Sequence, residues 1–179
     1  MTATELPRVA LPRRPTFDDA LIRKVMGHFC TGITVVTANH AGQRPIGFTC
    51  QSVVAVSLDP TYISFCPAKT SRSWALMRDP GAVCVNILAA EQRPICDVFA
   101  RSGDDKFAGL NWHRGWNGAP VLDGTLASIE ADIEFEHDAG DHTIVVARVS
   151  ALYAHEHREP LLFFRSGYGV FSADLGLEA

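Results

Sequence analysis

A run of cations and hydroxyl groups is the first feature of this sequence that could do chemistry. The run reads Lys69-Thr70-Ser71-Arg72-Ser73, and either Thr70 or Ser71 is suited to cap a short helix. The free N–H groups at a helix start and the helix dipole both favour a bound anion. The segment is therefore a candidate phosphate site, although composition alone favours an ordinary capped helix with solvated charges.

A second candidate is the polar patch Phe48-Thr49-Cys50-Gln51-Ser52, which interrupts a β-rich run of small and branched residues. An extended segment of small residues can present main-chain donors and acceptors to the edge of a planar heterocycle. The alternative is a strand whose hydroxyl and amide side chains face water.

The third candidate is the triplet Gly140-Asp141-His142, a hairpin turn followed by a histidine. A plain turn with an exposed histidine would show the same residues. The other histidines lack metal-ligand spacing to cysteine or acidic residues, so we expect no metal site. The chain also lacks a G-x-S-x-G nucleophile elbow.

A helix is expected near the start of the chain, ahead of these three segments. Thr16 precedes it and forms a weak capping box with Asp19. Apolar residues then recur at every fourth position, at Phe17, Leu21, Val25 and Phe29, so one face of this helix is apolar.

Most of the remaining chain has the pattern of short strands. The clearest one begins at Ala127, where apolar residues alternate with serine and acidic residues as far as Glu136, which predicts one buried and one acidic face. Further strands are predicted at 33–38, 45–57, 62–66, 83–88, 143–153 and 161–165, and helices at 70–77 and 90–100. Residues 102–124 have no regular pattern.

This order of elements predicts a mainly β fold. Many strands, hairpin loops and two or three helices favour an antiparallel β-barrel with flanking helices. Strands and helices do not alternate and no G-x-G-x-x-G is present, which disfavours a Rossmann sheet, and a Walker A segment is also missing.

Composition limits the class of protein further. The 179 residues suit one domain, from residue 16 to 179, behind a proline-rich flexible tail at 1–15. The net charge is -4 with no basic stripe, so nucleic acid is not an expected partner. No apolar run approaches the roughly 18 residues of a membrane span, and no signal peptide is evident. The five cysteines are expected to be reduced and mostly buried, in a cytoplasmic protein.

Taken together, these segments resemble the flavin reductase-like family, which includes the small reductase components of two-component flavin-dependent monooxygenases. The resemblance extends from about Phe17 to Phe171. Its closest likeness is to reductases that serve hydroxylases of aromatic and steroid rings. The matching pieces occur in family order: FCTGITVVTA, GFTCQSVVAVSLDP, ISFCPAKTSRSW, VCVNIL, DKFAGL, GDH and LLFFRSGYG.

The resemblance implies a fold, a reaction and a set of site residues. The fold is an FMN-binding split β-barrel with Greek-key topology, in a homodimer. The reaction is hydride transfer from NADH or NADPH to FMN or FAD, with the cofactors carrying the chemistry and no catalytic side chain required. The reduced flavin would then diffuse to a partner monooxygenase. His142 and Tyr168 would contact the nicotinamide nucleotide. The flavin would be held by Phe48, Thr49, Cys50, Gln51, Ser52, Ser57, Cys66, Pro67, Ala68, Lys69, Ser71, Arg72, Ser73, Lys106 and Phe107.

Other functions remain open at this point. The main alternative is a non-catalytic split barrel that carries or senses flavin or haem, and such a protein would not need the nicotinamide contact at His142. A scaffolding domain that binds no flavin is a further alternative. The residues do not distinguish FMN from FAD, or NADH from NADPH.

Overall fold

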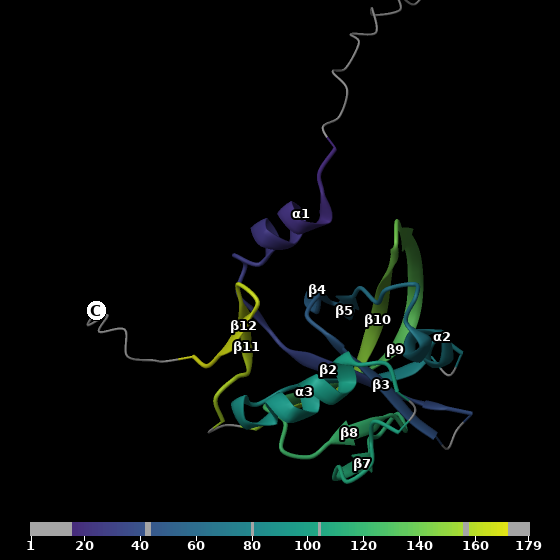
Figure 1. Ribbon diagram of the computed structural model, residues 1–179. Helices are drawn as coiled ribbons and strands as arrows, with labels where there is room; N and C mark the ends of the chain where they lie inside the picture. Colours follow the sequence, from purple (N-terminus) through teal and green to yellow (C-terminus); the bar gives the residue numbers. More distant parts are fainter. Residues whose placement is uncertain (1–15, 42–43, 80, 104, 156–157, 172–179) are drawn as a thin grey trace, which may run out of the picture.

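A seven-stranded antiparallel sheet forms the body of the protein in the computed structural model, which describes residues 16–41, 44–79, 81–103, 105–155 and 158–171 (Figure 1). The proposed tail at 1–15 lies outside these residues. The strands, in their order across the sheet, are β3 (Arg44–Cys50), β2 (Thr34–His40), β6 (Ala82–Ile87), β9 (Ala127–Ala139), β10 (His142–Ala154), β5 (Thr61–Phe65) and β4 (Val54–Leu58).

Two smaller sheets and four helical segments complete the described fold. One small sheet contains β1 (Thr31–Gly32), β11 (Leu162–Phe164) and β12 (Gly167–Gly169), and the other contains β7 (Trp112–Arg114) and β8 (Pro120–Leu122). The helical segments are α1 (Asp19–Met26), α2 (Arg72–Met77), the 3-10 turn η1 (Ala90–Gln92) and α3 (Arg93–Ala100). The prediction of a mainly β, antiparallel fold with a few helices is confirmed. No helix among the described residues is long and apolar enough to cross a membrane.

The large sheet is strongly curved, because side chains from near its two ends meet in one core. Phe48 on β3 and Phe65 on β5 have ring centroids 6.4 Å apart, although four strands separate β3 from β5 in the sheet order. Trp74 of α2 packs edge-on against Phe65 at 5.9 Å. Two irregularities in the β9–β10 register add local twist to the sheet.

The predicted strand at 45–57 is wrong, because this stretch forms two strands at opposite edges of the sheet. β3 ends at Cys50 and pairs with β2, whereas β4 begins at Val54 and pairs with β5. Residues 51–53 between them form no strand, and Ser52 Oγ accepts a hydrogen bond of 2.9 Å there from the Cys66 N–H. The polar patch therefore covers the end of β3 and the bend that follows it, and not the middle of one strand.

The acidic face predicted for β9 is interrupted at Glu130, which is 1% exposed. Its carboxylate accepts a hydrogen bond of 2.8 Å from the Asn117 N–H, and Gly115 approaches it so closely that a Cβ would lie 2.6 Å away. The turn before β8 covers this carboxylate, so tertiary packing overrides the alternation in the sequence.

The first helix forms as predicted but begins two residues later. Asp18, not Thr16, is its N-cap and accepts the Leu21 N–H at 2.6 Å. All four residues of the predicted apolar face are exposed, and Figure 1 shows α1 standing apart from the large sheet. The described part of the chain therefore leaves the apolar side chains of α1 uncovered.

Edge strand β3 lies between two helices, and Gly47 permits that arrangement. A Cβ at Gly47 would lie 2.8 Å from both the Phe99 ring of α3 and the Val36 carbonyl oxygen. On the opposite face of β3, Phe48 shares a core with Trp74 and Met77 of α2. Any side chain at position 47 would therefore push α3 away from the sheet.

Gly47→Ala is expected to lower the free energy of unfolding by about 1–3 kcal/mol, because the added methyl group overpacks a closed contact. Urea denaturation of the variant and the wild type measures the difference. Gly32→Ala is the matched control, since a Cβ at Gly32 would meet no atom within 4 Å. Equal losses in the two variants would contradict this account of β3.

Candidate functional site

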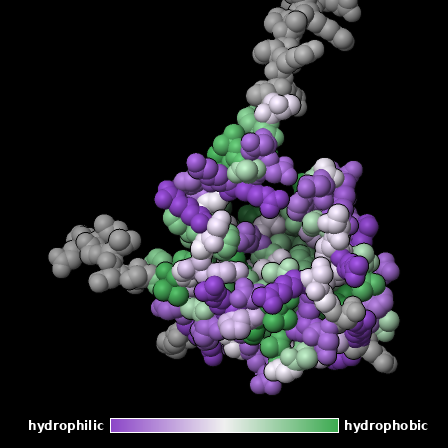
Figure 2. Space-filling view, viewed as in Figure 1, coloured by the Kyte–Doolittle hydropathy of each residue, from purple (hydrophilic) through white to green (hydrophobic). Residues whose placement is uncertain are grey.

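A cavity of about 690 Å³ opens where β3, the start of α2, the end of α3 and the β9–β10 hairpin meet. Figure 2 shows a hollow near the middle of one face of the molecule. This volume lies within the range of pockets that bind cofactors and other small molecules. The cavity is lined by segments that are far apart in the sequence, so the large sheet must form before the site exists.

The first wall of the cavity is the outer edge of β3. Lys106 Nζ donates to the Gly47 carbonyl at 3.2 Å, so this carbonyl points away from β2. Backbone groups two residues apart in a strand point the same way, which directs the N–H and the carbonyl of Thr49 outward as well. The Thr49 hydroxyl is engaged elsewhere, donating to the Cys96 carbonyl at 2.8 Å. The edge therefore presents a backbone donor and acceptor pair beside the cavity.

The second wall is the start of α2. Ser71 is its N-cap, and the Ser71 hydroxyl accepts the Trp74 N–H at 3.2 Å. The hydroxyl hydrogen of Ser71 is still available to a ligand, as are the first-turn N–H groups of Arg72 and Ser73, which have no acceptor within the helix. Burial of Trp74 and Met77 anchors the helix to the core.

The third wall is an extension of β5 along β10. Beyond the Phe65–Val145 pair, the Thr143 N–H donates to the Pro67 carbonyl at 3.0 Å and the Lys69 N–H donates to the Asp141 carbonyl at 2.9 Å. Ala68 and His142 are directly opposite each other in this ladder. Opposite residues project to the same face of a sheet, so His142 lies beside Ala68 at the cavity.

Tyr168 lies at another end of the cavity, among residues of α3. Cys96 Sγ is 3.4 Å from the Tyr168 hydroxyl, which donates to Asp97 Oδ1 at 3.4 Å, and the Arg93 guanidinium is 4.7 Å from the ring centroid. The hydrogen bond with Cys96 raises the pKa of Tyr168 to about 12, with burial and the charge of Asp97 adding to the effect. Tyr168 is therefore a neutral hydroxyl at physiological pH.

The lining of the cavity is basic although the whole chain carries a net charge of -4. It includes Arg44, Arg72, Arg101 and Lys106, and no Asp or Glu among the described residues lines it. Burial lowers the pKa of Lys106, whose ammonium donates to two backbone carbonyls. A cavity lined with positive charge attracts anionic ligands.

The structure brings most of the predicted site residues together. Three of them do not line the cavity: Ser57 lies in β4, Phe107 packs edge-on against Phe99 at 5.1 Å, and Lys69 contacts the β9–β10 hairpin. Those that line it are Phe48, Thr49, Cys50, Gln51, Ser52, Cys66, Pro67, Ala68, Ser71, Arg72, Ser73, Lys106, His142 and Tyr168.

Sequence reasoning missed several residues that line the cavity. Arg44 and Ile46 precede the polar patch and lie on the same face of β3 as Phe48. The period of two in a strand could have identified them. The residues around the end of α3 had no signal in the sequence. They are Cys96, Phe99, Ala100, Arg101, Ser102 and Gly103.

Comparisons with known proteins identify the family of this chain and its relatives. Residues 26–172 match the family model described as flavin reductase like domain. The chain is 46% identical over 157 residues to a flavin-dependent monooxygenase reductase subunit, HsaB, of Rhodococcus jostii, covering 88% of this chain and 80% of that protein.

Solved structures agree in fold as well. Nitrilotriacetate monooxygenase component B from Mycobacterium thermoresistibile superposes with a TM-score of 0.85 at 41% identity, covering 89% of this chain and 90% of that one. The NADH:FAD oxidoreductase SgcE6 of Streptomyces globisporus, solved in complex with NAD and FAD fragments, gives a TM-score of 0.83 at 31% identity, covering 88% and 95%.

The raised pKa of Tyr168 predicts how stability depends on pH. A tyrosine whose pKa is higher in the folded state keeps its contribution below pH 10 and loses it as the pH rises from 10.0 toward about 12. Tyr168→Phe is therefore expected to lose less stability than the wild type between these two values. Urea denaturation at pH 9 and pH 11 measures the two losses, and the same loss in both proteins would refute the assignment.

Proposed function

The chain belongs to the flavin reductase-like domain family, and we propose from that premise that it is an NAD(P)H:flavin oxidoreductase that supplies reduced flavin to a separate monooxygenase. One observation carries the proposal: a single basic cavity is lined by the edge of β3, by the start of α2 and by His142. A protein that only carries or senses flavin does not need a nicotinamide contact such as His142.

The walls of the cavity fit a flavin nucleotide. The outward N–H and carbonyl of Thr49 match a ring edge that carries both acceptors and donors. The first-turn N–H groups of Arg72 and Ser73, together with the Arg72 side chain, suit a phosphate. Pro67 and Ala68 supply a small, flat wall between these two regions.

When bound, the flavin accepts a hydride that the reduced nicotinamide donates. The protein's part is to bind and orient, because this reaction needs no general base. His142 and Tyr168 would hold the nicotinamide nucleotide, with the Tyr168 hydroxyl neutral. Positioning of two reactants in one site lowers the barrier by removing the entropy of their encounter.

The proposal extends to the split-barrel arrangement, the single domain from residue 16 onward and a homodimer. The curvature of the large sheet, whose end strands in the described part of the chain are β3 and β4, supports the split barrel. Exposed apolar side chains support a second copy: Figure 2 shows them gathered on α1, and β4 adds Val54, Val56 and Leu58, the last of which is 88% exposed. We further propose that the reduced flavin reaches the monooxygenase by diffusion.

Oxidation of NADH and NADPH, followed at 340 nm with FMN, FAD or riboflavin added in turn, tests the function directly. Rapid oxidation that depends on added flavin is the expected result, and the preferred pair identifies both cofactors. The basic lining predicts that FMN and FAD are used better than riboflavin, which lacks a phosphate. Bound flavin or haem without any oxidation would favour the carrier or sensor instead.

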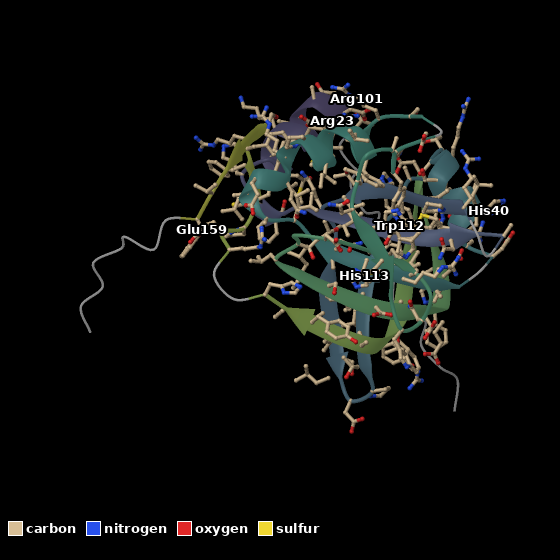
Figure 3. The ribbon with its side chains drawn as sticks, turned by 90° about the horizontal axis from the view of Figure 1, so that it is seen from below. Arg23, His40, Arg101, Trp112, His113 and Glu159 are labelled. Carbon is tan, nitrogen blue, oxygen red and sulfur yellow. The ribbon has the colours of Figure 1, made fainter. Side chains whose placement is uncertain are left out.

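His142→Ala is expected to raise the KM for NADH by about tenfold, the equivalent of one lost contact of roughly 1.4 kcal/mol. Flavin binding should change little, because the flavin walls come from other segments. His113→Ala is the matched control, since His113 lies on β7 (Figure 3), pairs with Asp123 at 3.0 Å and does not line the cavity. Unchanged NADH kinetics in His142→Ala would remove this residue from the site.

A further inference from the structure

Lys69 lies at the last pair of the β5–β10 ladder, where the ladder reaches the tip of the β9–β10 hairpin. The Phe65–Val145 pairing continues without a shift in register through Pro67 and Thr143 to Lys69 and Asp141. The backbone of residues 67–69 therefore has two neighbours. It borders the cavity at Pro67 and Ala68, and it pairs with the strand that carries His142.

Lys69 directly follows Ala68 but does not line the cavity. Ala68 and His142 are directly opposite and project to the cavity face. Lys69 follows in a turn, which the Ser71 N–H closes by donating to the Ala68 carbonyl at 3.0 Å. Its side chain extends instead to the β9–β10 hairpin, whereas its neighbours Ala68 and Thr70 line the cavity.

The Lys69 ammonium instead binds the turn of the hairpin. Lys69 Nζ donates to the Gly140 carbonyl at 2.6 Å and forms an ion pair with Asp138. Gly140, whose carbonyl accepts this hydrogen bond, has a φ of 67° and therefore adopts the left-handed backbone conformation. The lysine thus joins both sides of the turn to the segment that borders the cavity.

The position of this turn also sets the orientation of the His142 imidazole. His142 Nδ1 lies 2.8 Å from Asp141 Oδ1, and the hydrogen bond from His142 lowers the pKa of Asp141. A carboxylate acceptor requires the proton on Nδ1, which leaves Nε2 as the nitrogen that can meet a ligand. The direction of Nε2 therefore depends on where the backbone of residues 140–142 is held.

We propose that Lys69 is a positioning residue for the nicotinamide site, and that it acts by clamping the Gly140 carbonyl and Asp138 so that His142 stays beside Ala68. This inference rests on the proposed function. It assigns Lys69 to the site of the hydride donor and not to the flavin phosphate, although Lys69 is part of the run of cations and hydroxyl groups that leads into α2.

The decisive variant is Lys69→Met, which keeps the length of the side chain and removes the ammonium. The KM for NADH is expected to rise roughly fivefold, as for a lost, partly exposed charge pair of about 1 kcal/mol. The dissociation constant for FMN, measured by quenching of flavin fluorescence, should stay within about twofold of the wild type. Amide hydrogen exchange in residues 138–143 of the ligand-free protein should become faster, because the turn has lost its clamp.

Lys69→Arg is expected to restore most of the NADH affinity, since a guanidinium can still donate to Gly140 and pair with Asp138. Lys24→Met, on exposed α1, removes a lysine away from the cavity and should leave all three measurements unchanged. Asp138→Asn is a second variant in case Lys69→Met does not fold, and it should raise the KM for NADH about twofold to threefold.

Weaker FMN binding with an unchanged KM for NADH would overturn the proposal, because Lys69 would then act on the flavin. An unchanged KM in both Lys69→Met and Asp138→Asn would overturn it equally. Failure of the proposed function is a different result: the wild type itself would not oxidise NADH with any flavin. Hydrogen exchange would still test the clamp in that case, and equal exchange rates in the wild type and Lys69→Met would refute it.

Discussion

The site depends on one constraint above others, which is that β3 lies at the edge of the large sheet while helices cover both of its faces. An edge strand leaves half of its backbone donors and acceptors without a partner strand. Here α2 and α3 enclose that edge, and the missing side chain of Gly47 allows the close approach of Phe99. Backbone groups that would otherwise pair with another strand or with water are thereby directed into a cavity, where a ligand can use them.

The two substrates of the proposed reaction meet because two separate ladders end at the same cavity. β3 pairs with β2 at one edge of the sheet, and the extension of β5 pairs with β10 near the other edge. Curvature of the sheet brings these distant edges together, and the link from the Cys66 N–H to Ser52 Oγ joins them. A flatter sheet with the same pairings would separate His142 from the outward groups of Thr49.

Several sequence predictions succeeded because their physical causes are local. The cap at Ser71 depends on one hydroxyl and an N–H three residues away, and the turn at Gly140 depends on one residue with freedom of φ. Predictions failed where a distant segment decided the outcome. Glu130 is buried because the turn near Gly115 folds over it, and the bend after Cys50 forms because Cys66, sixteen residues later, supplies the N–H that Ser52 accepts.

The sequence by itself determined the class of fold, the candidate segments for phosphate and nicotinamide, and the family, because these are recorded in local spacing and in the order of motifs. It also indicated which residue types would surround the ligand. Only the tertiary structure decided which of those residues face the cavity, since Ala68 and Lys69 are neighbours in the chain but Ala68 lines the cavity while Lys69 binds the β9–β10 hairpin. It likewise added Arg44 and the end of α3 to the site, because those residues reach the cavity only through the curvature and packing of the whole sheet.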